Sequence, residues 1–292
     1  MLKILLLGHN GQLGTDLKRV HQQYQHEFEL IPVGRNTLDV SDLESLSSFL
    51  KNQPFDILIN CTSYHKTDEV EKSASLAFTI NAHAVKTMAE VSQNKNAKFF
   101  HISTDYVFSG ENKTPYLETD PAGPINVYGA SKAMGERLAL LINPQSTYIL
   151  RVASLFGIAG ASGKGGNFVE TMIKVGKEKG VLKVVNDVTM SPTSTLTIAQ
   201  TIFKLLRNNT PSGIYHVVNS GQATWYEFAK TIIEKTKIPA DVLPVTSQEF
   251  PTVALRPRFS VLNNTKAQNL AGPIPHWTEA LDLYLKEKGH IS

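Results

Sequence analysis

Two residues, Tyr128 and Lys132, have the types and the spacing of a proton donor and the group that activates it. A tyrosine and a lysine at positions i and i+4 lie on one face of a helix. A free tyrosine has a pKa of about 10, which is too high for easy proton exchange near neutrality. A nearby ammonium stabilises the phenolate and lowers that pKa. We therefore expect Tyr128 to protonate an oxygen that gains charge during a reaction, with Lys132 beside it.

A third polar group is expected to hold the oxygen that receives this proton. Ser103 and Thr104 follow an apolar run at residues 99–102, at the end of an expected strand. Tyr128 and Lys132 on their own would equally suit an exposed face of an amphipathic helix. The order of strand, Ser-Thr and Tyr-x-x-x-Lys favours a catalytic site.

A glycine turn near the start of the chain indicates a nucleotide site. Gly8, Gly11 and Gly14 follow an apolar run at residues 4–7 and open an expected helix. Glycine adopts positive φ and lets backbone approach a pyrophosphate, which the N–H groups of a helix N-terminus bind. An ordinary tight turn is the alternative, but the place of the triplet after the first strand favours the nucleotide.

Arg35 indicates which nicotinamide cofactor this site binds. It ends the next expected strand, where an acidic residue would bind a ribose 2′-hydroxyl and an arginine pairs with a 2′-phosphate. We expect NADPH, with NADH as the less favoured possibility and a solvated arginine as the alternative for Arg35. Asp39 or Val40 is expected at the adenine, and Asp42 as a helix cap. A nicotinamide site beside a proton donor is suited to reducing a carbonyl.

Composition describes an ordinary soluble protein and excludes several classes. Of the 292 residues, 41% are hydrophobic and 19% charged, and the net charge is +3 with scattered Lys and Arg, which argues against a nucleic-acid partner. A single Cys61 excludes an intramolecular disulfide framework and Cys-rich zinc sites, and a buried inert thiol is its simplest interpretation. The apolar start is too short to span a membrane and lacks a signal-peptide pattern, so we expect a cytoplasmic protein.

Short apolar runs alternate with helical stretches, and this alternation becomes less regular after Val152. The expected strands are residues 4–7, 30–33, 57–60, 99–102, 148–152 and 214–218, and the expected helices are residues 12–21, 43–51, 75–94, 131–141, 167–178, 198–206 and 225–234. The alternation predicts an α/β fold, a Rossmann-type doubly wound parallel sheet with a smaller C-terminal substrate-binding domain. We expect residues 1–156, with a contribution from about 183–218, to form the dinucleotide-binding domain. Residues 157–182 and 219–292 form the smaller domain, with a mobile loop at 157–166.

Longer motifs make a family resemblance specific. Residues 102–110 read ISTDYVFSG, residues 124–132 read PINVYGASK, and Gly135-Glu136 follows. With the glycine turn, Asp68, Glu71, Trp277 and residues 167–172, 185–187, 191–193 and 256–260, they resemble the dTDP-4-dehydrorhamnose reductase family of extended short-chain dehydrogenases. The resemblance covers essentially the whole chain.

The resemblance implies reduction of the 4-keto group of a dTDP-linked 6-deoxyhexose by NADPH, giving dTDP-L-rhamnose for surface polysaccharide. It implies Tyr128 as the acid, Lys132 as its partner and Thr104 as the holder of the carbonyl oxygen. The cofactor residues carried over or expected are Gly8, Asn10, Gly11, Gln12, Leu13, Gly14, Arg35, Asp39, Val40, Cys61, Thr62, Ser63, Tyr64, Asn81, Ser103, Tyr128 and Lys132. The expected substrate residues are Thr104, Asp105, Tyr106, Ser154, Asn167 and Arg256. Asn81 matches a position that supports the lysine through a water, and Arg256 contacts the diphosphate or packs against Pro257.

Three departures from the family pattern bear on the substrate and on metals. Ser154 replaces a Trp near the sugar, so we expect a remodelled sugar pocket. His65 replaces a Thr near the nicotinamide, as a polar contact or a packed side chain. Thr15 and Met190 occupy positions where some members hold magnesium through carboxylates, so we expect no metal, and either a monomer or a homodimer.

Two other functions stay open at this point. An epimerase or 4,6-dehydratase of the same superfamily needs tightly held NAD, which Arg35 disfavours, and dehydration needs a Glu that does not follow Thr104-Asp105. A cofactor-binding regulatory subunit without activity would usually have lost Tyr128 or Lys132. A related ketosugar is the alternative for the substrate.

Overall fold

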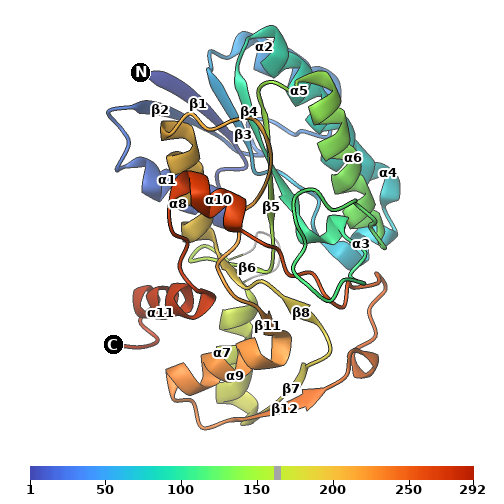
Figure 1. Ribbon diagram of the computed structural model, residues 1–292, viewed down its shortest axis with the longest axis vertical. Coiled ribbons are helices and arrows are strands. Elements are labelled where there is room, and N and C mark those ends of the chain that lie inside the picture. The colour runs from blue at the N-terminus through green and yellow to red at the C-terminus, as the bar shows by residue number, and fades with distance from the viewer. Residues whose placement is uncertain (161–165) are drawn as a thin grey trace.

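The computed structural model describes residues 1–160 and 166–292, and across these residues a parallel sheet forms the centre of the larger lobe (Figure 1). Its six strands lie in the order β10-β5-β4-β3-β1-β2. Every neighbouring pair is parallel. The bounds are β1 Leu2–Leu7, β2 Phe28–Val33, β3 Ile57–Asn60, β4 Lys98–Thr104, β5 Thr147–Val152 and β10 Gly213–His216. The predicted α/β class and parallel sheet are confirmed.

Helices cover both faces of this sheet because its strands are apolar on both sides. Ile4 and Leu6 pack with α1 (Gln12–His21), α8 (Thr195–Arg207) and α10 (Thr265–Ala271). Leu5 and Leu7 pack with α2 (Leu43–Asn52) and α5 (Ala84–Asn94), and α6 (Val127–Ile142) lies beside α5. Successive residues of one strand thus serve opposite faces, as the period of two requires.

The helix expected at 75–94 is divided. It comprises α4 (Ala74–Phe78), a π-helical turn at Thr79–His83 and α5. A β-carbon at Gly135 of α6 would lie 2.1 Å from the carbonyl oxygen of Asn81, so α6 and the π turn touch backbone to backbone. The one-residue widening therefore lies beside the helix that carries Tyr128, and such widenings are common near functional sites.

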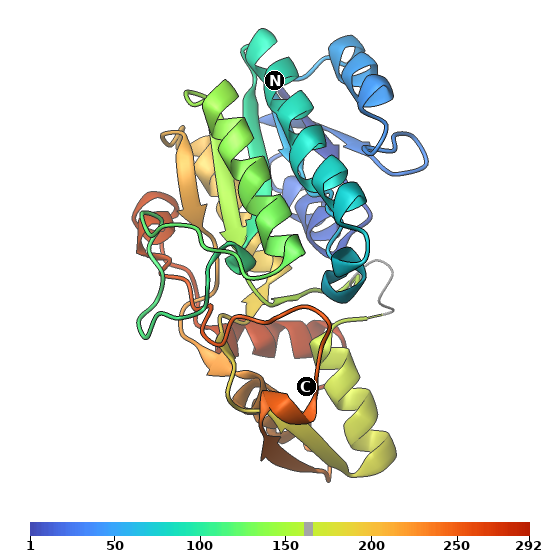
Figure 2. The same ribbon diagram turned by 90° about the vertical axis from the view of Figure 1, so that its right-hand side faces the viewer.

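A smaller lobe lies below the carboxyl ends of the strands (Figures 1 and 2). It contains the paired strands β7 (Val181–Val185) and β12 (Asp241–Val245), the pair β8 (Thr189–Met190) and β11 (Ala223–Thr224), and the helices α7 (Phe168–Lys179), α9 (Trp225–Thr236) and α11 (Trp277–Glu287). Phe168, Phe228 and Trp277 form its aromatic core. Short strands β6 (Leu155–Phe156) and β9 (Thr193–Ser194) pair where the chain passes between the lobes.

The structure divides the chain differently from the expected domain boundaries in two places. The segment from about 183 begins inside β7, which pairs with β12 of the smaller lobe, and the return to the larger lobe starts at α8. In the last third, Ala267 and Ala271 of α10 pack into the core of the larger lobe. Apolar periodicity shows that an element is buried but not against which lobe it is buried.

Two further expectations concern loops and membranes. Of the loop expected at 157–166, residues 161–165 lie outside the described residues. Among the helices that the structure describes, none has the length and apolar character needed to cross a bilayer.

Candidate active site

A cavity of about 1410 Å³ runs between the two lobes, along the carboxyl ends of the strands. It brings together most of the residues singled out from the sequence: Gly8, Asn10, Gly11, Gln12, Leu13, Gly14, Arg35, Asp39, Val40, Cys61, Thr62, Ser63, Ser103, Thr104, Asp105, Tyr106, Tyr128, Lys132, Ser154, Asn167 and Arg256. Within the described part of the chain, Tyr64 and Asn81 are not in its lining. The Asn81 amide instead accepts from the Tyr64 backbone N–H at 2.9 Å and donates to the Ser131 hydroxyl at 3.0 Å, which fixes the loop after β3.

The glycine turn joins β1 to α1 at one end of the cavity. Gly8 has φ +80°, and a β-carbon at Gly14 would lie 2.4 Å from the Gly8 carbonyl oxygen, so both positions require glycine for the turn itself. Gly11 differs, because a β-carbon there would meet only the Gly8 oxygen, at 3.5 Å, among the described residues. Gly11 is also the N-cap of α1 and offers no side chain to its free N–H groups. Open space beside an uncapped helix N-terminus fits a pyrophosphate.

Arg35 lies at the same end of the cavity and is accessible to a ligand. Its side chain is 84% exposed and its guanidinium is 3.4 Å from the Asp39 carboxylate. Hydrogen bonds from Ser41 lower the pKa of Asp39, which keeps that carboxylate charged. His9 also lines the cavity, with the Lys18 ammonium 3.3 Å from its Nδ1, and was not among the predicted residues.

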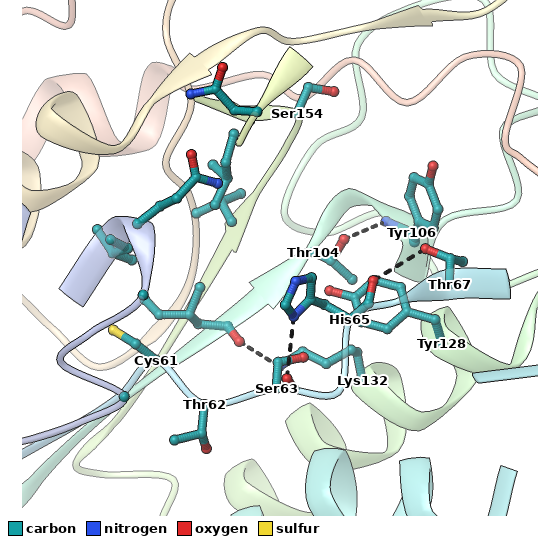
Figure 3. A pocket seen from close by; sticks show the side chains of 18 of the residues that line it. Cys61, Thr62, Ser63, His65, Thr67, Thr104, Tyr106, Tyr128, Lys132 and Ser154 are labelled. Atoms are coloured by element: carbon teal, nitrogen blue, oxygen red, sulfur yellow. Dashed lines mark hydrogen bonds between the residues drawn. The ribbon is translucent and has the colours of Figure 1, made fainter. Parts of the chain in front are cut away.

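Tyr128 is held at the start of α6. Asn126 caps this helix by accepting from the Gly129 N–H at 2.7 Å, and the Glu71 carboxylate accepts from the Val127 N–H at 2.8 Å. A β-carbon at Gly129 would lie 2.0 Å from the carbonyl oxygen of Tyr106, so α6 presses against the loop after β4. Figure 3 shows Tyr128 next to Thr104 and His65, with Ser154 at the other end of the view.

The expected lowering of the Tyr128 pKa by Lys132 is wrong. Burial raises the pKa of Tyr128 to about 12, and hydrogen bonds to Thr104 and Ser63 offset only part of that rise. The Lys132 side-chain nitrogen donates to the Ile102 carbonyl at 2.6 Å and lies 3.0 Å from Nε2 of His101. Burial lowers the pKa of Lys132 to about 7, against the opposing charge of Glu136. An i, i+4 spacing puts two side chains on one face but does not determine where the longer one ends.

The residues after β4 are polar, buried and tightly connected. The Ser103 hydroxyl donates to Glu136, which forms a buried ion pair with Arg151 at 2.7 Å. The Thr104 hydroxyl donates to Asp105 at 3.0 Å and accepts from the Tyr106 N–H at 3.2 Å. Burial raises the pKa of Asp105 to about 6. Ser103 is thus held by Glu136, while Thr104 lies at the cavity next to Tyr128.

Residues from the smaller lobe form the opposite wall. Ser154, between β5 and β6, has φ +45°, a left-handed conformation that non-glycine residues seldom adopt. Asn167 caps α7 by accepting from the Glu170 N–H at 3.1 Å, and its amide donates to the Gly157 carbonyl at 3.0 Å. Phe168, Thr171 and Trp225 also line this wall and were not predicted, since each reads as an ordinary core or helix residue.

A segment at residues 247–258, which we call the strap, passes along the boundary between the lobes (Figure 2). Gln248, Phe250, Pro251, Thr252, Leu255, Arg256 and Arg258 of the strap line the cavity. Asp68, in α3 (Thr67–Glu71), accepts from Arg256 at 2.8 Å and from the Ala254 N–H at 3.0 Å. Of these residues only Arg256 was predicted for the site; Arg258 belongs to the family motif at 256–260 but was given no role, and the rest of the strap carries no periodic pattern.

The sequence predicts no metal site, because Thr15 and Met190 occupy the positions at which some family members hold magnesium through carboxylates. Across the described residues no group of three or more His, Cys, Asp or Glu side chains is arranged to hold a metal ion.

The His65 ring lines the cavity, with its Nδ1 3.4 Å from the Ser63 carbonyl oxygen.

Comparisons with known proteins agree with this geometry. The sequence model of the RmlD substrate binding domain matches residues 2–289. The spore coat polysaccharide biosynthesis protein SpsK of Bacillus subtilis is 40% identical over 290 residues, covering 99% of this chain and 98% of SpsK.

Two crystal structures have nearly the same fold. A dTDP-4-dehydrorhamnose reductase from Clostridium acetobutylicum has a TM-score of 0.91 and 36% identity, covering 99% of this chain and 100% of that one. The dTDP-4-dehydrorhamnose reductase of Bacillus anthracis in complex with NADP has a TM-score of 0.90 and 35% identity, covering 98% and 99%. The resemblance found in the sequence is therefore confirmed, and the chain belongs to the family of the RmlD substrate binding domain.

Proposed function

We propose that this protein is an NADPH-dependent reductase that acts on the 4-keto group of a dTDP-linked 6-deoxyhexose, converting dTDP-4-dehydro-L-rhamnose to dTDP-L-rhamnose. The observation that carries the proposal is that the uncapped N-terminus of α1 and the Tyr128 side chain line one continuous cavity. The relatives named above support the substrate, since two of them are dTDP-4-dehydrorhamnose reductases.

The chain offers a complete set of groups for this cofactor. The backbone of residues 10–14 and the N-terminus of α1 would hold the diphosphate, and Arg35 would pair with the 2′-phosphate. Thr62 and Ser63 would line the nicotinamide half, where they enter the cavity beside Lys132. When bound, NADPH supplies the hydride that reduces the carbonyl carbon.

Tyr128 supplies the proton. With its pKa raised to about 12, its hydroxyl is fully protonated at neutral pH, so the donor is ready before the substrate binds. Thr104 lies beside it and would hold the carbonyl oxygen in line with that hydroxyl. A charged Lys132 would then stabilise the phenolate that Tyr128 leaves behind. The strap and Ser154 would surround the sugar nucleotide and exclude water.

The first test follows NADPH absorbance with purified protein and dTDP-4-dehydro-L-rhamnose. Replacing Tyr128 by Phe removes only the donor hydroxyl, so we expect turnover to fall roughly 10²- to 10⁴-fold while NADPH still binds. Tyr24→Phe, whose ring stacks on Phe203 away from the cavity, is the matched control and keeps full activity.

Other outcomes would point to the alternatives. Turnover unchanged in Tyr128→Phe would refute the assigned acid. NADPH binding without reduction of this sugar by the unmodified protein would favour a related ketosugar or a regulatory subunit. Recovery of the protein with bound NAD would favour an epimerase.

The cell compartment and the oligomeric state belong to the same proposal. A reduced cofactor and one free thiol suit a reducing compartment, so we propose the cytoplasm. We propose a monomer or a homodimer built without metal, which light scattering in the presence of EDTA would test.

A further inference from the structure

Three buried side chains form a hydrogen-bonded row behind the cavity. Asn60 ends β3, His101 lies on the neighbouring strand β4, and Lys132 reaches them from α6. The amide nitrogen of Asn60 is 3.1 Å from Nδ1 of His101, and Nε2 of His101 is 3.0 Å from the Lys132 amine. Their exposures are 0%, 0% and 1%. The catalytic proposal for Tyr128 and Lys132 uses neither Asn60 nor His101.

The backbone fixes which way each member of this row faces. The Thr62 N–H, which can only donate, lies 2.9 Å from the side-chain oxygen of Asn60, and the Thr62 hydroxyl donates to the same oxygen. The Asn60 amide nitrogen must therefore face His101, where it donates to Nδ1. Nδ1 then carries no hydrogen, so a neutral His101 has its hydrogen on Nε2.

This tautomer of His101 determines the protonation state of Lys132. The Nε2–H of His101 points at the Lys132 nitrogen, and an ammonium has no lone pair to accept it. An uncharged amine accepts from His101 and still donates to the Ile102 carbonyl at 2.6 Å. Every polar atom of the row is then satisfied, as buried groups require.

We infer that Asn60 and His101 hold Lys132 as an uncharged amine in the free protein, so that binding of NADPH is coupled to the uptake of one proton by Lys132. The inference rests on the proposed function in one respect, that this cofactor binds in this cavity. His101 and Asn60 are positioning residues, since they act through Lys132.

Among the residues that the structure describes, the two acidic groups that act on Lys132 are Glu136 and Cys61. Cys61 faces it as a neutral thiol, because burial raises the pKa of that thiol to about 12. Glu136, one turn along α6, is already paired with Arg151, and the Tyr128 hydroxyl is protonated. The phosphates of the cofactor would add negative charge to the cavity and favour the ammonium. On gaining its proton from solvent, Lys132 loses the bond from His101 and is free to turn toward the cavity and Tyr128.

Calorimetry of NADPH binding measures the proton directly. Titrations at pH 8.5 in two buffers of different ionisation enthalpy give the number of protons taken up per chain. At this pH free Lys132, with its pKa of about 7, is mostly uncharged, so we expect the unmodified protein to take up nearly one proton. Binding without uptake would overturn the inference and leave the proposed function intact, whereas a failure to bind would overturn the proposed function.

The Asn60→Asp variant tests whether the hydrogen bond from Asn60 to His101 is what keeps Lys132 uncharged. A carboxylate at position 60 accepts a hydrogen from Nδ1 of His101, which leaves the Nε2 lone pair facing Lys132 and stabilises the ammonium before NADPH binds. We expect uptake near zero in this variant and normal uptake in Asn143→Asp, a buried amide at the far end of α6. Equal uptake in Asn60→Asp and the unmodified protein would refute the role of the tautomer.

A second measurement is made on the unmodified protein, and a variant serves only to assign one signal. In the unliganded, [15N]histidine-labelled protein, nitrogen–hydrogen correlations distinguish the two neutral tautomers, and His101→Gln identifies the signal of His101 by its loss. We expect the hydrogen on Nε2. A hydrogen on Nδ1, or a doubly protonated ring, would contradict the inference whatever the variants do.

Discussion

At the scale of single residues, Tyr128 and Lys132 have different hydrogen-bond partners, although both line the cavity. Tyr128 faces the cavity, whereas the Lys132 nitrogen is bonded to Ile102 and His101. Burial pushes the pKa of the tyrosine upward and that of the lysine downward. Both groups are therefore uncharged near pH 8, and the site depends on its ligands to introduce the charges that the reaction needs.

The lowered pKa of Lys132 predicts a pH dependence of folding stability. The unfolded chain keeps its proton up to a pKa of 10.5, whereas the folded protein releases it at about 7. Since the unfolded state binds more protons between these values, stability should rise as pH increases through this window. Lys132→Met removes the group, so we expect its urea midpoint to rise less between pH 7 and pH 9 than that of the unmodified protein. An identical change in both proteins would contradict the prediction.

The positions of Asn60 and His101 show what residue types alone could not predict. Both lie in apolar runs and read as ordinary strand residues. Tyr128, Lys132 and Thr104 could be identified because their spacing follows the helix and the strand that carry them. A hydrogen-bonded row across two strands and a helix depends on tertiary contacts, which local spacing does not describe.

At the scale of elements, the turn between β1 and α1 separates two uses of glycine. Gly8 and Gly14 serve the turn itself, since added side chains would meet backbone at 3.0 Å and 2.4 Å. Gly11 leaves space on the cavity side, next to the N-terminus of α1.

This difference predicts opposite outcomes for two alanine variants. Gly11→Ala should fold with nearly unchanged thermal stability but bind NADPH at least tenfold more weakly, because its methyl group occupies the space left for the diphosphate. Gly14→Ala should lower both stability and affinity, by roughly 1–3 kcal/mol in stability for overpacking. Thermal unfolding and calorimetry measure the two properties separately. A Gly11→Ala protein that binds as tightly as the original would argue against a diphosphate at this turn.

Two side chains of the larger lobe bond to the strap, Asp68 and Asn126, and the Asn126 amide donates to the Leu255 carbonyl at 2.8 Å. Asp68 of α3 accepts both from Arg256 and from the Ala254 N–H, and Arg256 lies over the Tyr106 ring at 5.9 Å. We expect Asp68→Ala to raise the KM for the sugar nucleotide severalfold with a smaller effect on the affinity for NADPH, because the strap then loses the two hydrogen bonds that Asp68 accepts. Glu69→Ala, on the same helix, removes only an exposed ion pair with Lys66 and is the control. An unchanged KM in Asp68→Ala would show that the strap is held by other contacts.

Regular elements could be predicted better than the segments between them. The expected helix at 12–21 and strand at 57–60 match α1 and β3 residue for residue, because their apolar periods are unbroken. The helix at 75–94 contains a π turn that no period reveals. The strap has neither the apolar period of a helix nor that of a strand. Its position follows from the contacts of Asp68 and Asn126 rather than from its own sequence.

At the scale of the whole molecule, one cavity connects the glycine turn of the larger lobe to α7 and the strap. A ligand in it touches both lobes, so its binding free energy stabilises the molecule as a unit. NADP⁺ at about 100 times its Kd adds about 2.7 kcal/mol, or roughly 5–10 °C in Tm for a chain of this size.

The Arg35 side chain predicts that NAD⁺ gives a smaller shift at the same concentration. Scanning fluorimetry with both nucleotides measures the difference, and Arg35→Ala should reduce it by lowering the shift with NADP⁺ alone. Equal shifts with the two nucleotides would contradict the assigned role of Arg35.

The left-handed backbone at Ser154 limits how this pocket can be redesigned. A bulky side chain seldom adopts φ near +45°. Exchanging Ser154 for the tryptophan that the family pattern has there would therefore strain the backbone between β5 and β6. Changing sugar preference at this position therefore calls for a change of backbone course as well as of side chain.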